Sequence, residues 1–260
     1  MNAVADFETI LNQPEQELWA EYQNLRKEFL KSKALTVLER FITNLQNYPE
    51  ETRSKWVFAF CYALFDKGLI ETRDKISILQ YPLATRIILP ELRKGYEAKK
   101  LPYARWIAQM RGKFPLHQPK YLEILDLSEY DYDSLLEKAL ELDPQDSIAR
   151  EILIKNCISV LDYCIHEVPT GILADSNEFK KEIARFIELV TQQRTLESYR
   201  KKLVGWQFHA DSWGDYLALR PEFKNYTEYL TAKFPAMSKN LYLLSNPENV
   251  YDLLKSEENV

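Results

Sequence analysis

The feature that most constrains the fold is a pair of apolar helical stripes between residues 130 and 169, interrupted at Pro144. Proline lacks the amide hydrogen that a helix needs and clashes with the preceding turn, so the first helix must end there. Asp146 or Ser147 can then cap a second helix. The pattern predicts an antiparallel helix pair, whose second member buries a wide face made of Ile148, Ile152, Cys157, Val160, Leu161, Cys164 and Ile165.

The rest of the chain repeats this helical pattern. Only 6 of the 260 residues are glycine, and the alternating runs typical of strands are scarce. We therefore predict an all-α protein, a compact or solenoid-like array of antiparallel helical hairpins. It should form one helical domain over residues 1–260, in which any two subdomains would meet near 112–130, where glycine and prolines end the period. Residues 56–65 are apolar nearly all round, which predicts the buried core helix of the N-terminal half.

The sequence lacks the usual targeting and cofactor motifs. No apolar run reaches the ~18 residues of a membrane span, and the first ten residues lack the basic start and apolar core of a signal peptide. The three cysteines fall on apolar faces, as is typical of buried thiols in a reducing compartment. No phosphate loop, dinucleotide fingerprint, HExxH motif or paired-cysteine zinc spacing is present. We therefore expect a cytoplasmic protein with no cofactor, no metal and no membrane partner.

Charge is distributed unevenly along the chain, whose net charge is -5. Residues 86–120 contain nine basic and two acidic side chains, and residues 126–151 contain nine acidic and two basic ones. Neighbouring segments of opposite sign can neutralise each other or bind two different partners. The sequence leaves both possibilities open.

The acidic segment begins with tyrosines that alternate with carboxylates. Exposed tyrosines supply contact area at a low entropic cost, and carboxylates attract a basic partner. The pattern predicts a partner-binding surface made of Glu129, Tyr130, Asp131, Tyr132 and Asp133. The alternative is structural, because acidic residues stabilise the first turn of a helix and the tyrosines can be half-buried.

The basic segment carries interleaved aromatic residues, Tyr96, Tyr103 and Trp106. This composition is typical of surfaces that bind nucleic acid. In that case Lys99, Lys100 and Arg105 would contact phosphate groups. The alternative is a solvated face that pairs with the neighbouring acidic segment.

Two histidine clusters are candidate pockets. Asp162 and His166 lie four residues apart, a spacing that suits either a ligand or base pair, or a histidine that stabilises the end of a helix. His209 and Asp211 lie between two tryptophans, which could form an aromatic-walled cleft or a polar corner in a packed core. The possible pocket therefore comprises Asp162, His166, Trp206, His209, Asp211 and Trp213, none of which is assigned a catalytic role.

Residues 137–153 resemble the junction between tetratricopeptide repeats, with Ala139, Leu140, Leu142, Asp143 and Pro144 as the end of such a repeat would have them. The resemblance implies helix pairs that stack. In that family such stacks form a groove that binds protein segments, a role that the sequence leaves open here. The segment does not recur at the ~34-residue period of a repeat array.

These features favour a non-catalytic, protein-binding module. One specific form is an immunity or antitoxin protein that neutralises a basic toxin through its acidic, tyrosine-bearing surface. The alternatives are a nucleic-acid-associated protein that uses residues 86–120, and an enzyme with a site near His209.

Overall fold

The structure, a computed structural model, describes residues 7–68, 79–113, 130–235 and 237–257. Every regular element in these ranges is helical and none is a strand, so the all-α prediction is confirmed. The chain divides into two compact units, Met1–Ala149 (unit 1) and Arg150–Val260 (unit 2). This division falls inside a helix, whereas the sequence placed any meeting of subdomains near 112–130, most of which lies outside the described residues.

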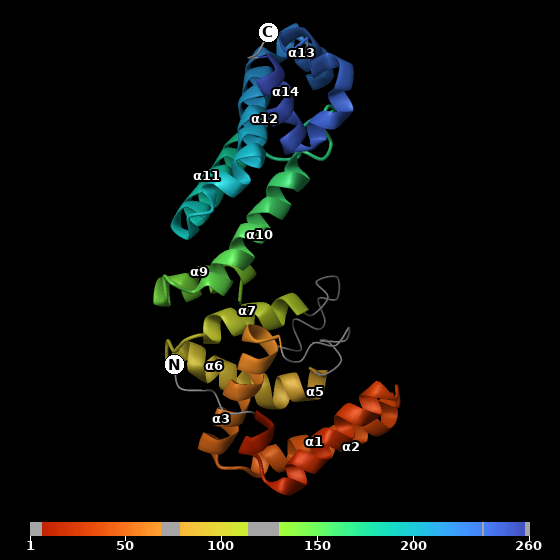
Figure 1. Ribbon diagram of the computed structural model, residues 1–260, viewed down its shortest axis with the longest axis vertical. Helices are drawn as coiled ribbons and strands as arrows, with labels where there is room; N and C mark the ends of the chain where they lie inside the picture. The colour runs from red at the N-terminus through yellow and green to blue at the C-terminus, as the bar shows by residue number, and fades with distance from the viewer. Residues whose placement is uncertain (1–6, 69–78, 114–129, 236, 258–260) are drawn as a thin grey trace. The chain divides into compact units, whose positions relative to one another are not determined.

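Unit 1 contains short and long helices that pack as neighbouring pairs (Figure 1). In order they are η1 (Phe7–Ile10), α1 (Gln13–Lys27), α2 (Lys31–Asn47), α3 (Glu50–Cys61), η2 (Tyr62–Asp66), α5 (Tyr81–Leu83), η3 (Ala84–Ile88), α6 (Leu89–Glu97), α7 (Tyr103–Lys113) and α9 (Tyr132–Leu142). α1 and α2 form a hairpin, α6 packs on α7, and α7 packs on α9.

The core of unit 1 is aromatic. Trp56 and Phe60 of α3 stack at a ring distance of 5.1 Å, and both are buried. Phe7, Trp19 and Phe41 pack around this pair from η1, α1 and α2. The predicted core helix at 56–65 is therefore confirmed, because most of its side chains are buried.

Two turns of unit 1 are π-helical, η2 and η3. In η3 the Leu89 amide donates to the carbonyl oxygen of Ala84, five residues earlier in the chain. Pro90 follows at once and cannot donate to the carbonyl four residues before it, so the wider turn accommodates the proline without ending the helix.

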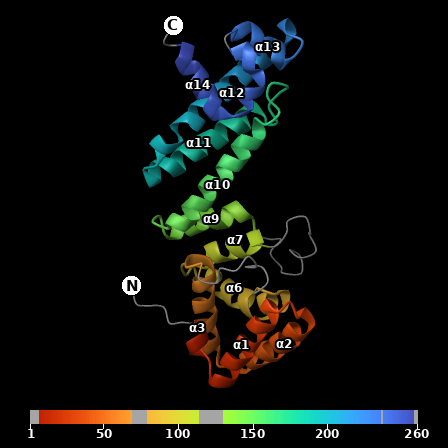
Figure 2. The same cartoon turned by 45° about the vertical axis from the view of Figure 1, so that its right-hand side comes forward.

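Unit 2 begins in α10 (Ser147–Cys164), which crosses the boundary between the units. α12 packs on α11 and on α14, and α11 and α12 run side by side in both views (Figures 1 and 2). A Cβ at Gly205 would lie 2.1 Å from the Pro247 carbonyl oxygen, so α12 and α14 approach closely only because this residue is glycine. The further elements are α11 (Ser176–Gln193), η4 (Leu196–Tyr199), α12 (Arg200–Leu219), η5 (Arg220–Glu222), α13 (Tyr226–Lys233), η6 (Met237–Ser245) and α14 (Pro247–Glu257).

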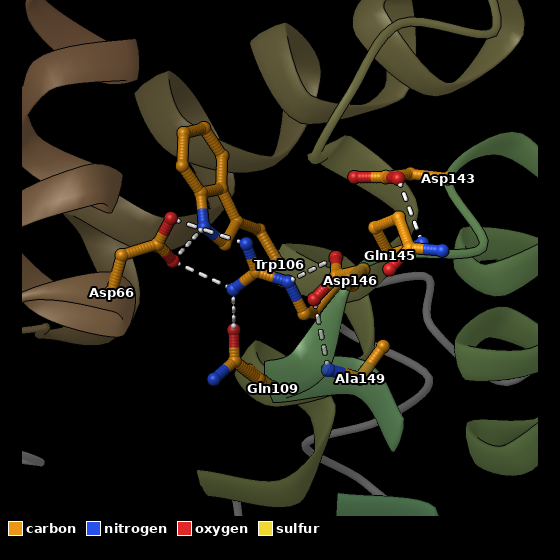
Figure 3. Close-up of polar contacts among 8 residues, drawn as sticks. Asp66, Trp106, Gln109, Asp143, Gln145, Asp146 and Ala149 are labelled. Carbon is orange, nitrogen blue, oxygen red and sulfur yellow. Dashed lines mark hydrogen bonds and ion pairs between the residues drawn. The ribbon is translucent and has the colours of Figure 1, made fainter. Parts of the chain in front are cut away.

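A buried ion-pair network in unit 1 joins the basic and acidic segments (Figure 3). Arg105 of α7 donates to both carboxylate oxygens of Asp66, at 2.6 and 3.1 Å, and to Asp146 Oδ2 at 2.8 Å. Trp106 Nε1 donates to the same Asp66 carboxylate at 2.8 Å. The second oxygen of Asp146 accepts from the amide of Ala149 at 3.0 Å, which confirms the predicted cap of α10.

Candidate functional site

The acidic, tyrosine-bearing segment is engaged in contacts within unit 1. Glu129 lies outside the described residues. Asp131 caps α9, because its Oδ2 accepts from the Ser134 amide at 2.9 Å, and this hydrogen bond lowers the pKa of Asp131. Tyr130 packs edge-on against Tyr96 at 5.5 Å, with the Arg93 guanidinium over its ring.

Tyr132 and Asp133 are also partly covered. Burial raises the pKa of Tyr132, and a Cβ at Gly112 would come within 3.0 Å of its ring. α9 begins at Tyr132, so Asp133 lies in its first turn. These contacts match the structural alternative, and a partner at this surface stays a prediction.

The basic segment provides fewer free cations than its sequence suggests. Arg105 and Trp106 are buried, so the expectation that Arg105 contacts phosphate is corrected. Arg86 pairs with Glu39 at 2.6 Å, and Lys94 pairs with Glu50 and Glu91 at 2.6 and 3.2 Å. Three cations of this segment, Arg86, Lys94 and Arg105, are therefore paired with carboxylates of unit 1.

His209 and Asp211 do not form a catalytic pair. His209 is fully buried, and its Nε2 donates to the Leu244 carbonyl oxygen at 2.8 Å. Its Nδ1 is buried and has no hydrogen-bond partner in the described part of the chain. Asp211 is 74% exposed and lies 3.3 Å from Lys180, at an open groove between α11 and α12. Trp213 packs instead against Tyr216 and Tyr226.

Unit 2 should lose stability in mild acid because of His209. Burial lowers the pKa of His209 from 6.5 to about 4, although its hydrogen bond to Leu244 opposes the shift. The unfolded chain therefore binds a proton more readily than the folded one, so the stabilising contribution is complete above pH 6.5 and is lost as the pH falls towards 4. The loss amounts to about 3 kcal/mol. Denaturant titrations across this range should show it.

The matched variant for this titration is His209→Gln, which can still donate to the Leu244 carbonyl but does not titrate. The difference in unfolding free energy between the two proteins should narrow as the pH falls from 7 to 4. A difference that is constant over this range would show that His209 takes up its proton equally in both states.

Asp162 has partners other than His166. Its Oδ2 accepts from Lys202 Nζ at 2.9 Å, and its Oδ1 accepts from Trp206 Nε1 at 3.1 Å. Both donors lie on α12, while Asp162 lies on α10. The structure thus brings Asp162 and Trp206 together, whereas His166 contacts Tyr163 and Glu167. Trp206 is fully buried, so the contact secures the packing of the two helices.

The His166 ring stacks on an exposed tyrosine. The centroids of the His166 and Tyr163 rings lie 5.0 Å apart, at an interplanar angle of 22°. The His166 ring also donates from Nδ1 to the Tyr163 carbonyl oxygen at 2.9 Å, and its Nε2 lies 2.8 Å from Glu167 Oε1. Tyr163 is nevertheless 64% exposed.

Two apolar side chains are also exposed near Tyr163. Val160, one turn earlier on α10, is 47% exposed, which corrects the expectation that it is buried. Leu173 is 48% exposed, and its amide donates to the Cys164 carbonyl at 2.9 Å. We call this set the α10 surface and define it as Val160, Tyr163, His166, Glu167 and Leu173.

The sequence predicted only His166 among these five residues. Cys157, Leu161 and Cys164 mark a narrow buried stripe on α10, and Val160 lies at its edge. Tyr163 lies outside that stripe. The helical period therefore places Tyr163 away from the buried residues, but it does not separate Val160 from them, since Val160 lies one turn from both Cys157 and Cys164.

Comparisons with protein-family models, with curated proteins and with solved structures find no match to this chain. Among the described residues, no group of three or more His, Cys, Asp or Glu side chains is placed to hold a metal ion. None of the described helices combines the length and the apolar character needed to cross a membrane.

Proposed function

We propose that the protein is a non-catalytic, protein-binding module that contacts its partner through the α10 surface. The observation that supports this most strongly is the conformation of Tyr163, which is exposed yet held by the His166 ring. An aromatic side chain fixed before binding loses little rotational freedom in a complex. Such residues frequently dominate the energy of protein interfaces.

The neighbours of Tyr163 suit the same role. Val160 and Leu173 add apolar area that folding leaves exposed. Glu167 places an exposed carboxylate beside the His166 ring, 2.8 Å from its Nε2, so a basic partner would be favoured. The tetratricopeptide-like segment at 137–153 spans the end of α9 and the start of α10, and members of that family bind protein segments. A protein that neutralises a basic toxin is one specific form of this function.

Replacing Tyr163 with alanine should weaken partner binding by about 2 kcal/mol, or roughly 30-fold, if the tyrosine is a central contact. The protein would be used as bait in an extract of its native host, and the captured partner would then be titrated against the variants. Most of the loss should lie in faster dissociation, since aromatic contacts act at short range.

Tyr242→Ala is the matched control, because Tyr242 is 70% exposed in η6 of the same unit. It removes the same side chain from a different surface and should leave binding unchanged. Equal affinity of the wild type and Tyr163→Ala for the captured partner would contradict the proposal. Equal losses for both tyrosine variants would also contradict it, because the effect would then not be specific to the α10 surface.

A further inference from the structure

The turn between α1 and α2 exposes two adjacent apolar residues. α1 ends at Lys27, α2 begins at Lys31, and the turn lies at one end of the hairpin (Figures 1 and 2). Phe29 is 77% exposed and Leu30 is 39% exposed. Phe29 adopts a left-handed conformation, with φ of 60°, and the Leu30 amide donates to the Leu25 carbonyl at 2.9 Å.

Local stability does not explain the residues at this turn. Glycine is the favoured residue at the left-handed position that ends a helix, and this chain has phenylalanine there. The N-cap of α2 is Leu30, which offers no side-chain hydrogen bond. The first turn of α2 carries Lys31 and Lys33, although the helix dipole disfavours cations at that end. Three choices that oppose helix stability at one turn are typical of a functional segment.

The turn is also strongly basic in a chain of net negative charge. Residues 26–35 include four basic side chains and one acidic side chain. Lys27, Lys31 and Lys33 are exposed, and none of the three forms an ion pair within the described ranges. These three lysines therefore flank the exposed Phe29 and Leu30 in the chain, and no carboxylate of the described residues neutralises them.

We propose that this hairpin tip, defined as Lys27, Phe29, Leu30, Lys31 and Lys33, binds an anionic lipid surface. Phe29 and Leu30 enter the boundary between headgroups and acyl chains, and the lysines remain at the level of the lipid phosphates. An anionic lipid surface can contact the apolar residues of the tip and the cations beside them at the same time. A protein partner would need an apolar pocket with an acidic rim. The expectation of no membrane partner rested on the lack of a spanning segment, which does not bear on surface binding.

This inference is independent of the proposed function, because the hairpin tip belongs to unit 1 and the α10 surface to unit 2. The test is co-sedimentation of the full chain with phosphatidylcholine vesicles that do or do not contain phosphatidylserine. Binding is expected only with phosphatidylserine and should weaken as salt is added. Replacing both Lys31 and Lys33 with glutamine should weaken binding about 30-fold, at about fivefold for each lysine.

Phe29→Gly separates binding from folding. It should weaken vesicle binding by about 10-fold or more, because an inserted aromatic side chain is lost. Its melting temperature should not fall, because glycine adopts the left-handed conformation without strain. The matched control is Lys99→Gly, which relieves the same conformation at the end of α6, where φ is 53°. This control also removes a lysine and should bind vesicles like the wild type.

Equal sedimentation with both kinds of vesicle, or none with either, would overturn the inference. So would wild-type binding by Phe29→Gly. If phosphatidylserine vesicles are not bound and Phe29→Gly instead loses a captured protein, the hairpin tip is a protein contact and the lipid assignment is wrong.

Discussion

Replacing Arg105 with alanine is expected to lower the free energy of unfolding by about 3–5 kcal/mol. Arg105 is buried between Asp66 and Asp146, which lie 2.6 and 2.8 Å from its guanidinium nitrogens. Without Arg105 both carboxylates would remain in a site with little water and no cation. Urea titrations of the wild type and the variant at pH 7 measure this difference.

The deficit of Arg105→Ala should shrink in acid. A buried carboxylate without a partner is favoured in its protonated form, so the variant gains relative stability as the pH falls. Arg86→Ala is the control, because Arg86 pairs with Glu39 at a partly exposed position. Loss of an exposed pair should cost at most about 1 kcal/mol. Similar costs for the two arginine variants would contradict the structural role given to Arg105.

Replacing Phe60 with alanine is expected to lower the free energy of unfolding by about 3–5 kcal/mol. Phe60 is fully buried, stacks on Trp56, and meets the edges of Phe7 and Trp19 at 5.4 and 5.8 Å. The truncation would leave a cavity among large rigid rings, which cannot move together to fill it. Thermal and denaturant unfolding should both show the loss.

The control for Phe60→Ala is Phe29→Ala, the same substitution at an exposed residue. Surface substitutions of this kind usually change stability by less than about 0.5 kcal/mol. Equal effects at the two positions would show that α3 is not the core helix of unit 1.

The fold was predictable where short-range patterns determine it. Residues 56–65 are apolar on every side, and a helix of that kind must be buried wherever it is placed. Pro144 and Asp146 specify the end of one helix and the cap of the next through contacts within a few residues. These elements needed no knowledge of the tertiary structure.

The polar contacts were not predictable, because they join residues far apart in the chain. Arg105 and Lys99 are both cations of one basic segment, and the sequence does not distinguish them. Arg105 is buried because Asp66 and Asp146, which are distant in the chain, pair with it. Asp162 looked like the partner of nearby His166, but its partners are Lys202 and Trp206, on another helix. Sequence spacing alone cannot find such pairs.

The candidate site was only partly predictable for a related reason. The exposure of Tyr163 depends on which face of α10 the remainder of unit 2 covers. Its ring contacts His166, which follows the end of α10 at Cys164 and stacks on the tyrosine. A histidine at the end of a helix was anticipated, but its contact with Tyr163 was not.

The most direct test of the proposed binding function is hydrogen–deuterium exchange of the protein with and without its captured partner. The α10 surface lies on the last turn of α10 and the residues that follow it, so peptides covering 157–173 should exchange more slowly in the complex. Peptides from η6, which carries the control residue Tyr242, should exchange at the same rate in both samples. Slower exchange elsewhere, with no change over 157–173, would contradict the assignment of binding to the α10 surface.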